Sequence, residues 1–412
     1  MGYSENSLKK GLDMHVGSDT MLFWLTIMLW SQRILVQYAR VIIIRLPIIG
    51  IMADTLISLM YIVLILFSLP AIVRRLRGVD YGFGIGVVAV YLLNYVAFPD
   101  NEGYLDRNME TFLLSTFPLY YIGVSMDYKK IYPWLYRVSM ITIFLFSVYN
   151  LFISNALQES GAIEAGDMWA SYNLLPHVAV VILQTLRKAK AMNIIASVVG
   201  IAMLMSLGTR GTIVCLAVVI AIYLIAFREY RYPALARIGI IAAAFLLLVF
   251  LDDIMRFLQE IVEKLGMSVR IFEKYFDGEL LEDSGRSRIQ DRLMELVREN
   301  PVKGYGLFAD RSKLGSYAHH IVIELWVNFG VIVGTGLLAA ILALLVKTSR
   351  RLKDAEGEVL LILPLFGAGL VKLFMSGSYL NETNFFLLLG LCVCVVRNHS
   401  IGSLNDGLAE RR

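Results

Sequence analysis

Long apolar runs alternate with short polar stretches along almost the whole chain. A helix needs roughly 20 apolar residues to cross a bilayer, and about twelve runs approach this length. They lie near residues 20–46, 52–73, 82–98, 110–126, 132–154, 169–186, 190–207, 211–228, 234–252, 319–347, 358–375 and 382–397. The pattern predicts an all-α integral membrane protein, with residues 1–412 forming a single polytopic domain of about twelve transmembrane helices.

The composition agrees with this class of protein. Hydrophobic residues make up 58% of the chain and charged residues 17%, whereas a soluble domain carries about 25% charged residues. The mean hydropathy is +0.66. The net charge of +4 says little by itself. For a protein of this class we expect a lipid bilayer as a partner and no nucleic acid.

Basic residues gather in alternate loops. They lie near residues 74–77, 129–137, 187–190, 228–237 and 347–353, whereas the loops near 99–108 and 155–167 are acidic or neutral. If the N terminus is cytoplasmic, every strongly basic loop also falls on the cytoplasmic side, as the positive-inside rule requires. The charges therefore predict a multi-pass protein with both termini in the cytoplasm.

With this topology, one large loop over residues 253–318 lies on the extracytoplasmic side, between the ninth and tenth spans. Its first part repeats apolar residues at helical spacing (Ile254, Phe257 and Ile261) and predicts an amphipathic helix. This helix either lies on the membrane surface or packs against the outer ends of the spans. The loop is therefore predicted to be partly helical.

A second helix is predicted later in this loop. Ser284 is its expected N-cap, and Asn300 with Pro301 ends it. Arg286 and Arg288 then fall in the first turn, where the helix dipole favours anions. Free backbone amides beside two arginines form a corner suited to phosphate. The alternative is that both arginines pair with the acidic side chains of the loop, which are Glu282, Asp283 and Asp291.

Arg210 is a lone cation in a tight connection, between Gly208 and Gly211, on the predicted extracytoplasmic side. One interpretation is an arginine at a helix end whose charged group reaches the lipid headgroups. The other is an anion-binding site, because the flanking glycines allow a ligand to approach the backbone closely.

His319 and His320 stand at the start of the tenth predicted span, and Glu324 follows on the same apolar helix. Histidine is the side chain whose ordinary pKa suits proton transfer near neutral pH. Glu324 either orients an imidazole or faces a polar cavity. We expect no metal here, since adjacent helical residues point about 100° apart and no third ligand has the right spacing.

Taken together, these pieces resemble the O-antigen ligase and polymerase superfamily of bacterial membrane enzymes. The resemblance rests on Thr209-Arg210-Gly211, Ser284-Gly285-Arg286, Pro301 with Gly304 and Gly306, and Ala318-His319 with Glu324 and Gly330. It implies that Arg210 and Arg286 hold the diphosphate of a lipid carrier and that His319 activates the acceptor hydroxyl. The family commonly has Asn after this histidine, whereas this chain has His320, which leaves His320 open as the alternative base.

The resemblance implies a glycosyltransferase in the bacterial inner membrane, with its active site on the periplasmic face and no cofactor. We expect polymerisation of undecaprenyl-diphosphate-linked oligosaccharide units, as in O-antigen, capsule or exopolysaccharide synthesis. The alternative is ligation of a finished glycan to lipid A core or another acceptor. The implied partners are the lipid-linked glycan donor, a glycan or lipid acceptor and a chain-length regulator. A flippase or other transporter is disfavoured, because the two halves of the chain lack sequence symmetry.

Overall fold

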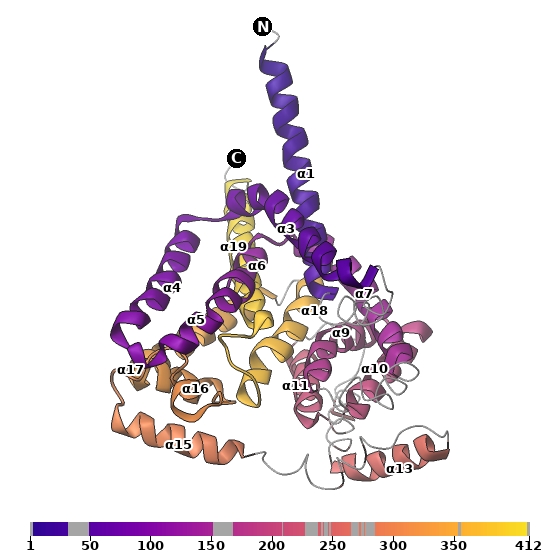
Figure 1. The fold of residues 1–412 in the computed structure, drawn as a ribbon. Coiled ribbons are helices and arrows are strands. Elements are labelled where there is room, and N and C mark those ends of the chain that lie inside the picture. The colour runs from indigo at the N-terminus through magenta and orange to yellow at the C-terminus, as the bar shows by residue number, and fades with distance from the viewer. Residues whose placement is uncertain are drawn as a thin grey trace.

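A computed structural model of the chain describes residues 3–31, 49–150, 168–207, 209–226, 251–264, 285–352 and 356–409, with isolated residues between 238 and 276. Within these ranges every regular element is a helix (Figure 1). The predicted all-α fold class is therefore confirmed. The predicted spans near 20–46 and 234–252 lie largely outside the described residues.

The helices follow the predicted apolar runs. In chain order they are α1 (Tyr3–Ser31), α3 (Ile49–Arg75), α4 (Gly78–Ala97), η2 (Pro99–Asn101), α5 (Glu102–Glu110), η3 (Thr111–Thr116), α6 (Leu119–Ser125), α7 (Tyr128–Val148), α9 (Met168–Arg187), α10 (Ala191–Ser206), α11 (Arg210–Ala226), α13 (Leu251–Lys264), α15 (Arg286–Glu299), α16 (Ala309–Leu314), α17 (Ile321–Leu352), α18 (Glu356–Leu365), η5 (Phe366–Leu370), η6 (Val371–Phe374) and α19 (Thr383–Ala409).

Several of these helices can cross a membrane. By length and composition, 4 described helices qualify, namely Thr55–Arg75, Gly78–Ala97, Tyr128–Val148 and Ile321–Leu352. Shorter apolar helices cover Ala191–Ser206, Arg210–Ala226 and Thr383–Asn398. The total of about twelve spans stays a prediction, as does the side of the membrane on which the loop near 253–318 lies.

The predicted runs 110–126 and 358–375 are not continuous α-helices. The first consists of the π-helix η3 and the short helix α6, and the second of α18, a π-helix and a 3-10 helix. Pro118 and Pro364 lie at or near these interruptions, and a proline removes a backbone donor and crowds the preceding turn. Apolar composition alone does not reveal such breaks.

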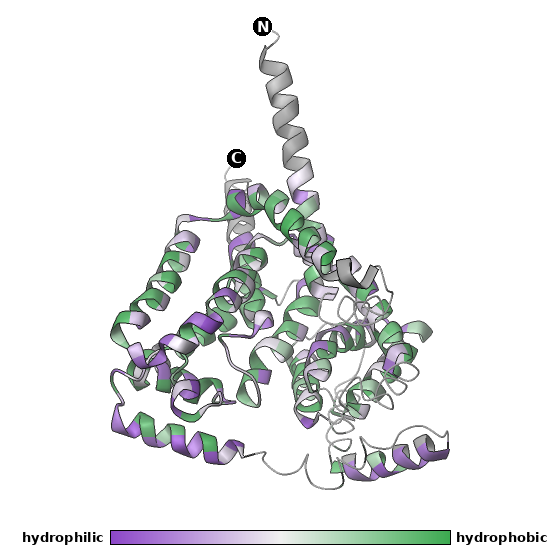
Figure 2. Cartoon of the chain, viewed as in Figure 1, coloured by the Kyte–Doolittle hydropathy of each residue, from purple (hydrophilic) through white to green (hydrophobic). Residues whose placement is uncertain are grey.

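The outer helices expose apolar side chains. Leu66 of α3 is 57% exposed and Val96 of α4 is 84% exposed, and hydrophobic residues run along both helices (Figure 2). A soluble monomer rarely leaves such continuous apolar surface in water, whereas a bilayer covers it. This surface and the apolar helices are those of a membrane protein.

A buried ion pair joins α4 to the C-terminal helix. The two guanidinium nitrogens of Arg397 in α19 donate to the two carboxylate oxygens of Asp80 at 2.6 and 2.7 Å. The Tyr120 hydroxyl donates to the same carboxylate at 3.0 Å. Asp80 is 0% exposed, so bidentate pairing and a third donor compensate for its lost hydration.

The long helix α17 is broken at Gly330, whose backbone has φ 76° and ψ 167°. In an uninterrupted helix, the amide of Val331 would donate to the carbonyl of Val327. Here Val331 donates instead to the Pro301 carbonyl at 2.7 Å, and the Val327 carbonyl accepts from the Tyr305 amide at 2.8 Å. The segment after α15 therefore supplies both of the partners that the break removes.

The same segment compensates a second carbonyl of the broken turn. The Asn328 carbonyl accepts from the Gly306 amide at 3.0 Å. This exchange requires close contact, since a Cβ added at Gly304 would lie 2.5 Å from the Gly330 amide nitrogen. Gly304 and Gly330 thus allow the 301–306 segment to pack against the break, whereas a Cβ added at Gly306 would meet Phe98 and Asn94.

A methyl group at Gly330 should destabilise the protein. An added Cβ would lie 2.1 Å from the Val302 carbonyl oxygen, and the left-handed backbone alone costs about 1–3 kcal/mol for a non-glycine residue. We expect Gly330→Ala to lower the midpoint of thermal unfolding of the purified protein in detergent. Gly336→Ala is the matched control, because it lies in the same helix with nothing within 4 Å. Equal midpoints for the two variants would contradict this account of the break.

Candidate functional site

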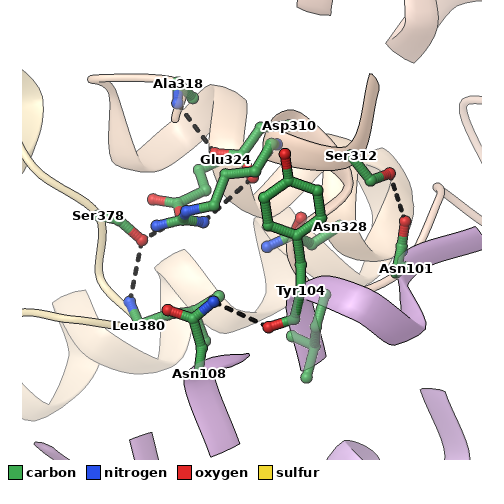
Figure 3. Close-up of polar contacts among 12 residues, drawn as sticks. Asn101, Tyr104, Asn108, Asp310, Ser312, Ala318, Glu324, Asn328, Ser378 and Leu380 are labelled. Carbon is green, nitrogen blue, oxygen red and sulfur yellow. Dashed lines mark hydrogen bonds and ion pairs between the residues drawn. The ribbon is translucent and has the colours of Figure 1, made fainter. Parts of the chain in front are cut away.

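The segment between α15 and α17 carries the predicted histidines, and α4 with η2 holds it in place. The Leu307 amide donates to the Asn94 side chain at 2.7 Å. The Asn101 side-chain amide donates to the Tyr305 carbonyl at 2.7 Å and its oxygen accepts from the Ser312 hydroxyl at 2.5 Å (Figure 3). Residues about 200 positions apart in the chain therefore anchor this segment.

A buried cluster of charged side chains comes from the residues on either side of the histidines in the sequence. Asp310 and Glu324 are 0% exposed, and Arg311 is 7% exposed. One guanidinium nitrogen of Arg311, Nη1, lies 3.2 Å from Asp310 and 3.6 Å from Glu324. Burial raises the pKa of the Asp310 carboxyl, although Arg311 and two backbone amides act in the opposite direction.

Glu324 connects this cluster to the segment before α19. The Ser378 hydroxyl donates to the Glu324 carboxylate (Figure 3). The Tyr379 amide donates to the same carboxylate at 3.2 Å. One turn further along α17, the Asn328 side chain donates to the Tyr379 hydroxyl at 3.0 Å. Glu324 therefore contacts Arg311, Ser378 and Tyr379, and its predicted role, to orient an imidazole or to face a polar cavity, stays a prediction.

His319 lies beside an aromatic ring at the edge of the cluster. Its ring centroid is 4.0 Å from that of Tyr317, and the Arg311 guanidinium carbon is 5.8 Å from the same tyrosine ring. The His319 backbone is left-handed, with φ 55°. This is an uncommon conformation for a residue with a side chain, and the surrounding contacts must hold it.

His320 is half-buried and faces a different neighbour. Its ring meets the edge of the Phe374 ring at a centroid distance of 5.5 Å. Burial lowers the pKa of the His320 imidazole. A lowered pKa favours the neutral ring but also makes it a weaker proton acceptor, and the role of His320 as the alternative base stays a prediction.

Arg286 is the first residue of α15 and turns toward the segment that follows α18. Its Nη1 donates to the Met375 carbonyl at 2.9 Å, and its Nη2 lies 3.9 Å from the Met168 sulfur. The N-cap is Gly285, which has no side chain to occupy the helix N terminus. The prediction of Ser284 as the N-cap is therefore wrong by one residue, whereas the predicted end at Asn300 is confirmed. The acidic residues Glu282 and Asp283 lie outside the described residues.

Arg288 lies apart from Arg286. Two positions along an α-helix correspond to about 200° around its axis, and Arg288 is exposed while Arg286 is half-buried. The two arginines predicted to share one anion therefore point in different directions. A role for Arg288 stays a prediction and would need a ligand that extends outside the helix.

Tyr172 in α9 is the buried residue around which the other groups gather. A Cβ added at Gly211 would lie 2.1 Å from its hydroxyl oxygen, and the Lys372 ammonium is 4.9 Å from its ring centroid. Met168, one turn before Tyr172 in α9, lies 3.9 Å from Nη2 of Arg286. The start of α11 thus contacts Tyr172, and the start of α15 contacts the first turn of the same helix.

Arg210 begins α11 and pairs with α13. Its guanidinium lies 3.4 Å from Asp252, near the start of that helix. The predicted amphipathic helix is confirmed as α13, and its Met255 packs against Met205 of α10, while Phe257 is 62% exposed. Arg210 therefore links the connection before α11 to a helix that packs against the ends of the neighbouring spans.

The sequence reasoning missed several site residues. They are Asp310, Arg311, Tyr317, Lys372 and Glu382, the last two of which form a buried ion pair. A signal existed, because Asp310 and Arg311 are adjacent charges between Phe308 and Gly315, close to the histidines. Within the described ranges, no three His, Cys, Asp or Glu side chains are grouped so that they could hold a metal ion.

Part of the chain matches a known family. Residues 195–338 match a family described as O-antigen ligase, and this range contains Arg210, Arg286, Arg288, His319 and Glu324. No curated protein and no solved structure matched the chain. Residues 195–338 therefore carry the domain of the O-antigen ligase family, which confirms the resemblance to the O-antigen ligase and polymerase superfamily of glycan-transferring membrane enzymes.

Proposed function

We propose that this protein polymerises oligosaccharide units carried on undecaprenyl diphosphate. The observation that carries the proposal is the meeting of a predicted diphosphate-binding arginine with the predicted bases. Arg286 donates to Met375 while the adjacent Phe374 contacts His320. The ring of Tyr317 is tilted against that of His319, with 4.0 Å between the centroids. Cation and imidazole thus occupy one region, as glycosyl transfer from a diphosphate carrier requires.

The chemistry needs few groups. A sugar linked to a diphosphate already has a good leaving group, so the main requirement is to neutralise the charge that develops on it. Fixed arginines can do this, and we assign Arg286 and Arg210 to that role, with Arg288 as a further contact. His319 takes the proton of the acceptor hydroxyl. The hydroxyl oxygen attacks the anomeric carbon while the bond to the diphosphate oxygen breaks, and undecaprenyl diphosphate leaves.

The same arrangement serves a ligase. Polymerase and ligase share the donor and differ in the acceptor, which is a second lipid-linked glycan in one case and lipid A core or another acceptor in the other. The match to a family described as O-antigen ligase does not distinguish the two activities. We retain polymerisation as the first proposal, and a chain-length regulator as its partner.

The arrangement of the helices supports the proposed topology. The described ends of α1 and α19 lie on the opposite side of the molecule from α13 and α15 (Figure 1). The positive-inside rule assigns the termini to the cytoplasm. We therefore infer that the site near α15 faces the periplasm or cell exterior of a bacterial inner membrane, where the lipid-linked donor is presented.

Removing Arg286 should abolish chain growth. In cells that lack the native polymerase, we expect the unaltered protein to restore a glycan ladder on a gel. Arg286→Ala should leave single units, with a fall in rate on the order of 100-fold, because one fixed charge on the leaving group is lost. Arg292→Ala is the control, since Arg292 is an exposed arginine of the same helix that pairs with Glu295. Attachment of preformed chains to a new acceptor, without a ladder, would identify a ligase.

Substitution of the two histidines should have different effects on activity in the same assay. We expect His319→Ala to lose activity, because it removes the proposed base, and His320→Ala to keep a ladder. The membrane content of each variant, measured by immunoblot, excludes loss of the protein. Loss of activity in His320→Ala alone would transfer the role of base to His320.

The product should have the opposite anomeric configuration from the donor. Direct attack of the acceptor hydroxyl on the anomeric carbon inverts that centre in one displacement. Nuclear magnetic resonance of the newly formed linkage, compared with the lipid-linked donor, measures the configuration. Retention would require two displacements and would rule out the direct mechanism.

A further inference from the structure

The cluster of Asp310, Arg311 and Glu324 is buried. Its contribution to the stability of the fold is reduced by the free energy needed to remove its charges from water. Two carboxylates and one guanidinium are removed from water, and each buried ion loses several kcal/mol of hydration. Apolar residues of similar volume often stabilise a protein as well as such a cluster does. The contacts of the cluster therefore call for an explanation beyond packing.

Asp310 accepts a hydrogen bond from the backbone next to His319. Its Oδ2 accepts from the Ala318 amide at 2.9 Å, and its Oδ1 accepts from the amide and the guanidinium of Arg311 at 2.9 and 3.2 Å (Figure 3). Ala318 is 0% exposed and directly precedes His319, whose left-handed backbone costs about 1–2 kcal/mol. The Asp310 carboxylate thus fixes the backbone at Ala318, directly before the left-handed backbone of His319.

Arg311 and Glu324 connect Asp310 to the segment before α19. The guanidinium joins Asp310 to Glu324, and Glu324 in turn accepts from Ser378 and Tyr379. The segment before Ser378 includes Met375, whose carbonyl accepts from Arg286. Hydrogen bonds and ion pairs therefore run from the Ala318 amide, next to His319, to Ser378. Ser378 lies three residues after Met375, which accepts from Arg286.

We propose that Asp310 is a positioning residue for the histidine base, held by Arg311 and Glu324 so that His319 keeps a fixed place relative to Arg286. This inference rests on the proposed glycan transfer. Asp310 itself touches neither donor nor acceptor in this role. Its carboxylate orders the backbone at Ala318, and through it the imidazole that must reach the acceptor hydroxyl.

Asp310→Asn tests the proposal. The amide keeps the size of the side chain but cannot accept from the Ala318 amide and from Arg311 together. With purified protein and lipid-linked donor, we expect kcat to fall on the order of 100-fold, as a small displacement of a reacting group does, with the donor KM unchanged. Hydrogen exchange of the peptide spanning residues 315–322 should become faster. Arg286→Ala should lower kcat as well but, unlike Asp310→Asn, should also raise the donor KM.

Asp100→Asn is the matched control. Asp100 is also a carboxylate paired with a cation of α16, since it lies 3.1 Å from Lys313, but its side chain is 76% exposed. We expect this variant to match the unaltered protein in kcat and in exchange. A folded Asp310→Asn variant with unaltered kcat, or with unaltered exchange over residues 315–322, would overturn the proposal.

Glu324→Gln decides the question if Asp310→Asn does not fold. It leaves Asp310 and Arg311 as a neutral pair and keeps an acceptor for Ser378, while it weakens the link across the site. We expect a smaller fall in kcat with unchanged donor KM, and faster exchange at the same peptide. Unaltered kcat and exchange would refute the proposal. Absence of glycan transfer by the unaltered protein would contradict the proposed function separately, because the exchange measurement does not depend on activity.

Discussion

The break in α17 at Gly330 is the constraint on which the site depends. A broken helix at membrane depth leaves backbone groups that no water can satisfy, and these must find partners within the protein. The segment from Pro301 to Gly306 supplies them, through bonds to Val327, Asn328 and Val331. The chain before the histidines is therefore bonded to the helix that follows them. These bonds hold residues 301–306 next to residues 327–331.

Two of the buried carboxylates that the structure describes, those of Asp80 and Glu324, are each held by more than one group. Asp80 receives Arg397 and Tyr120, and Glu324 receives donors from another part of the chain. In a low-dielectric interior such pairs are directional and costly to rearrange. They join helices that are distant in sequence, and so they fix the relative positions of α4, α17 and α19.

Parts of this arrangement were predictable because they follow from local physics. The end of α15 at Asn300 follows from a proline that cannot continue a helix, and α13 follows from its apolar spacing. The interrupted helices near residues 110–126 and 358–375 were not predicted. Hydropathy averages over a window, whereas a break depends on which backbone groups can find partners elsewhere in the fold.

The sequence by itself determined the class of the protein and the residue types of its chemistry. Apolar composition required a membrane, and the order of arginine, glycine and histidine motifs indicated the family that residues 195–338 match. Only the tertiary structure decided which residues work together. It turned Arg286 inward and Arg288 outward, and it joined Asp310 to Ala318. Periodicity places residues on the faces of a helix, but the helices that pack against it decide which face is buried.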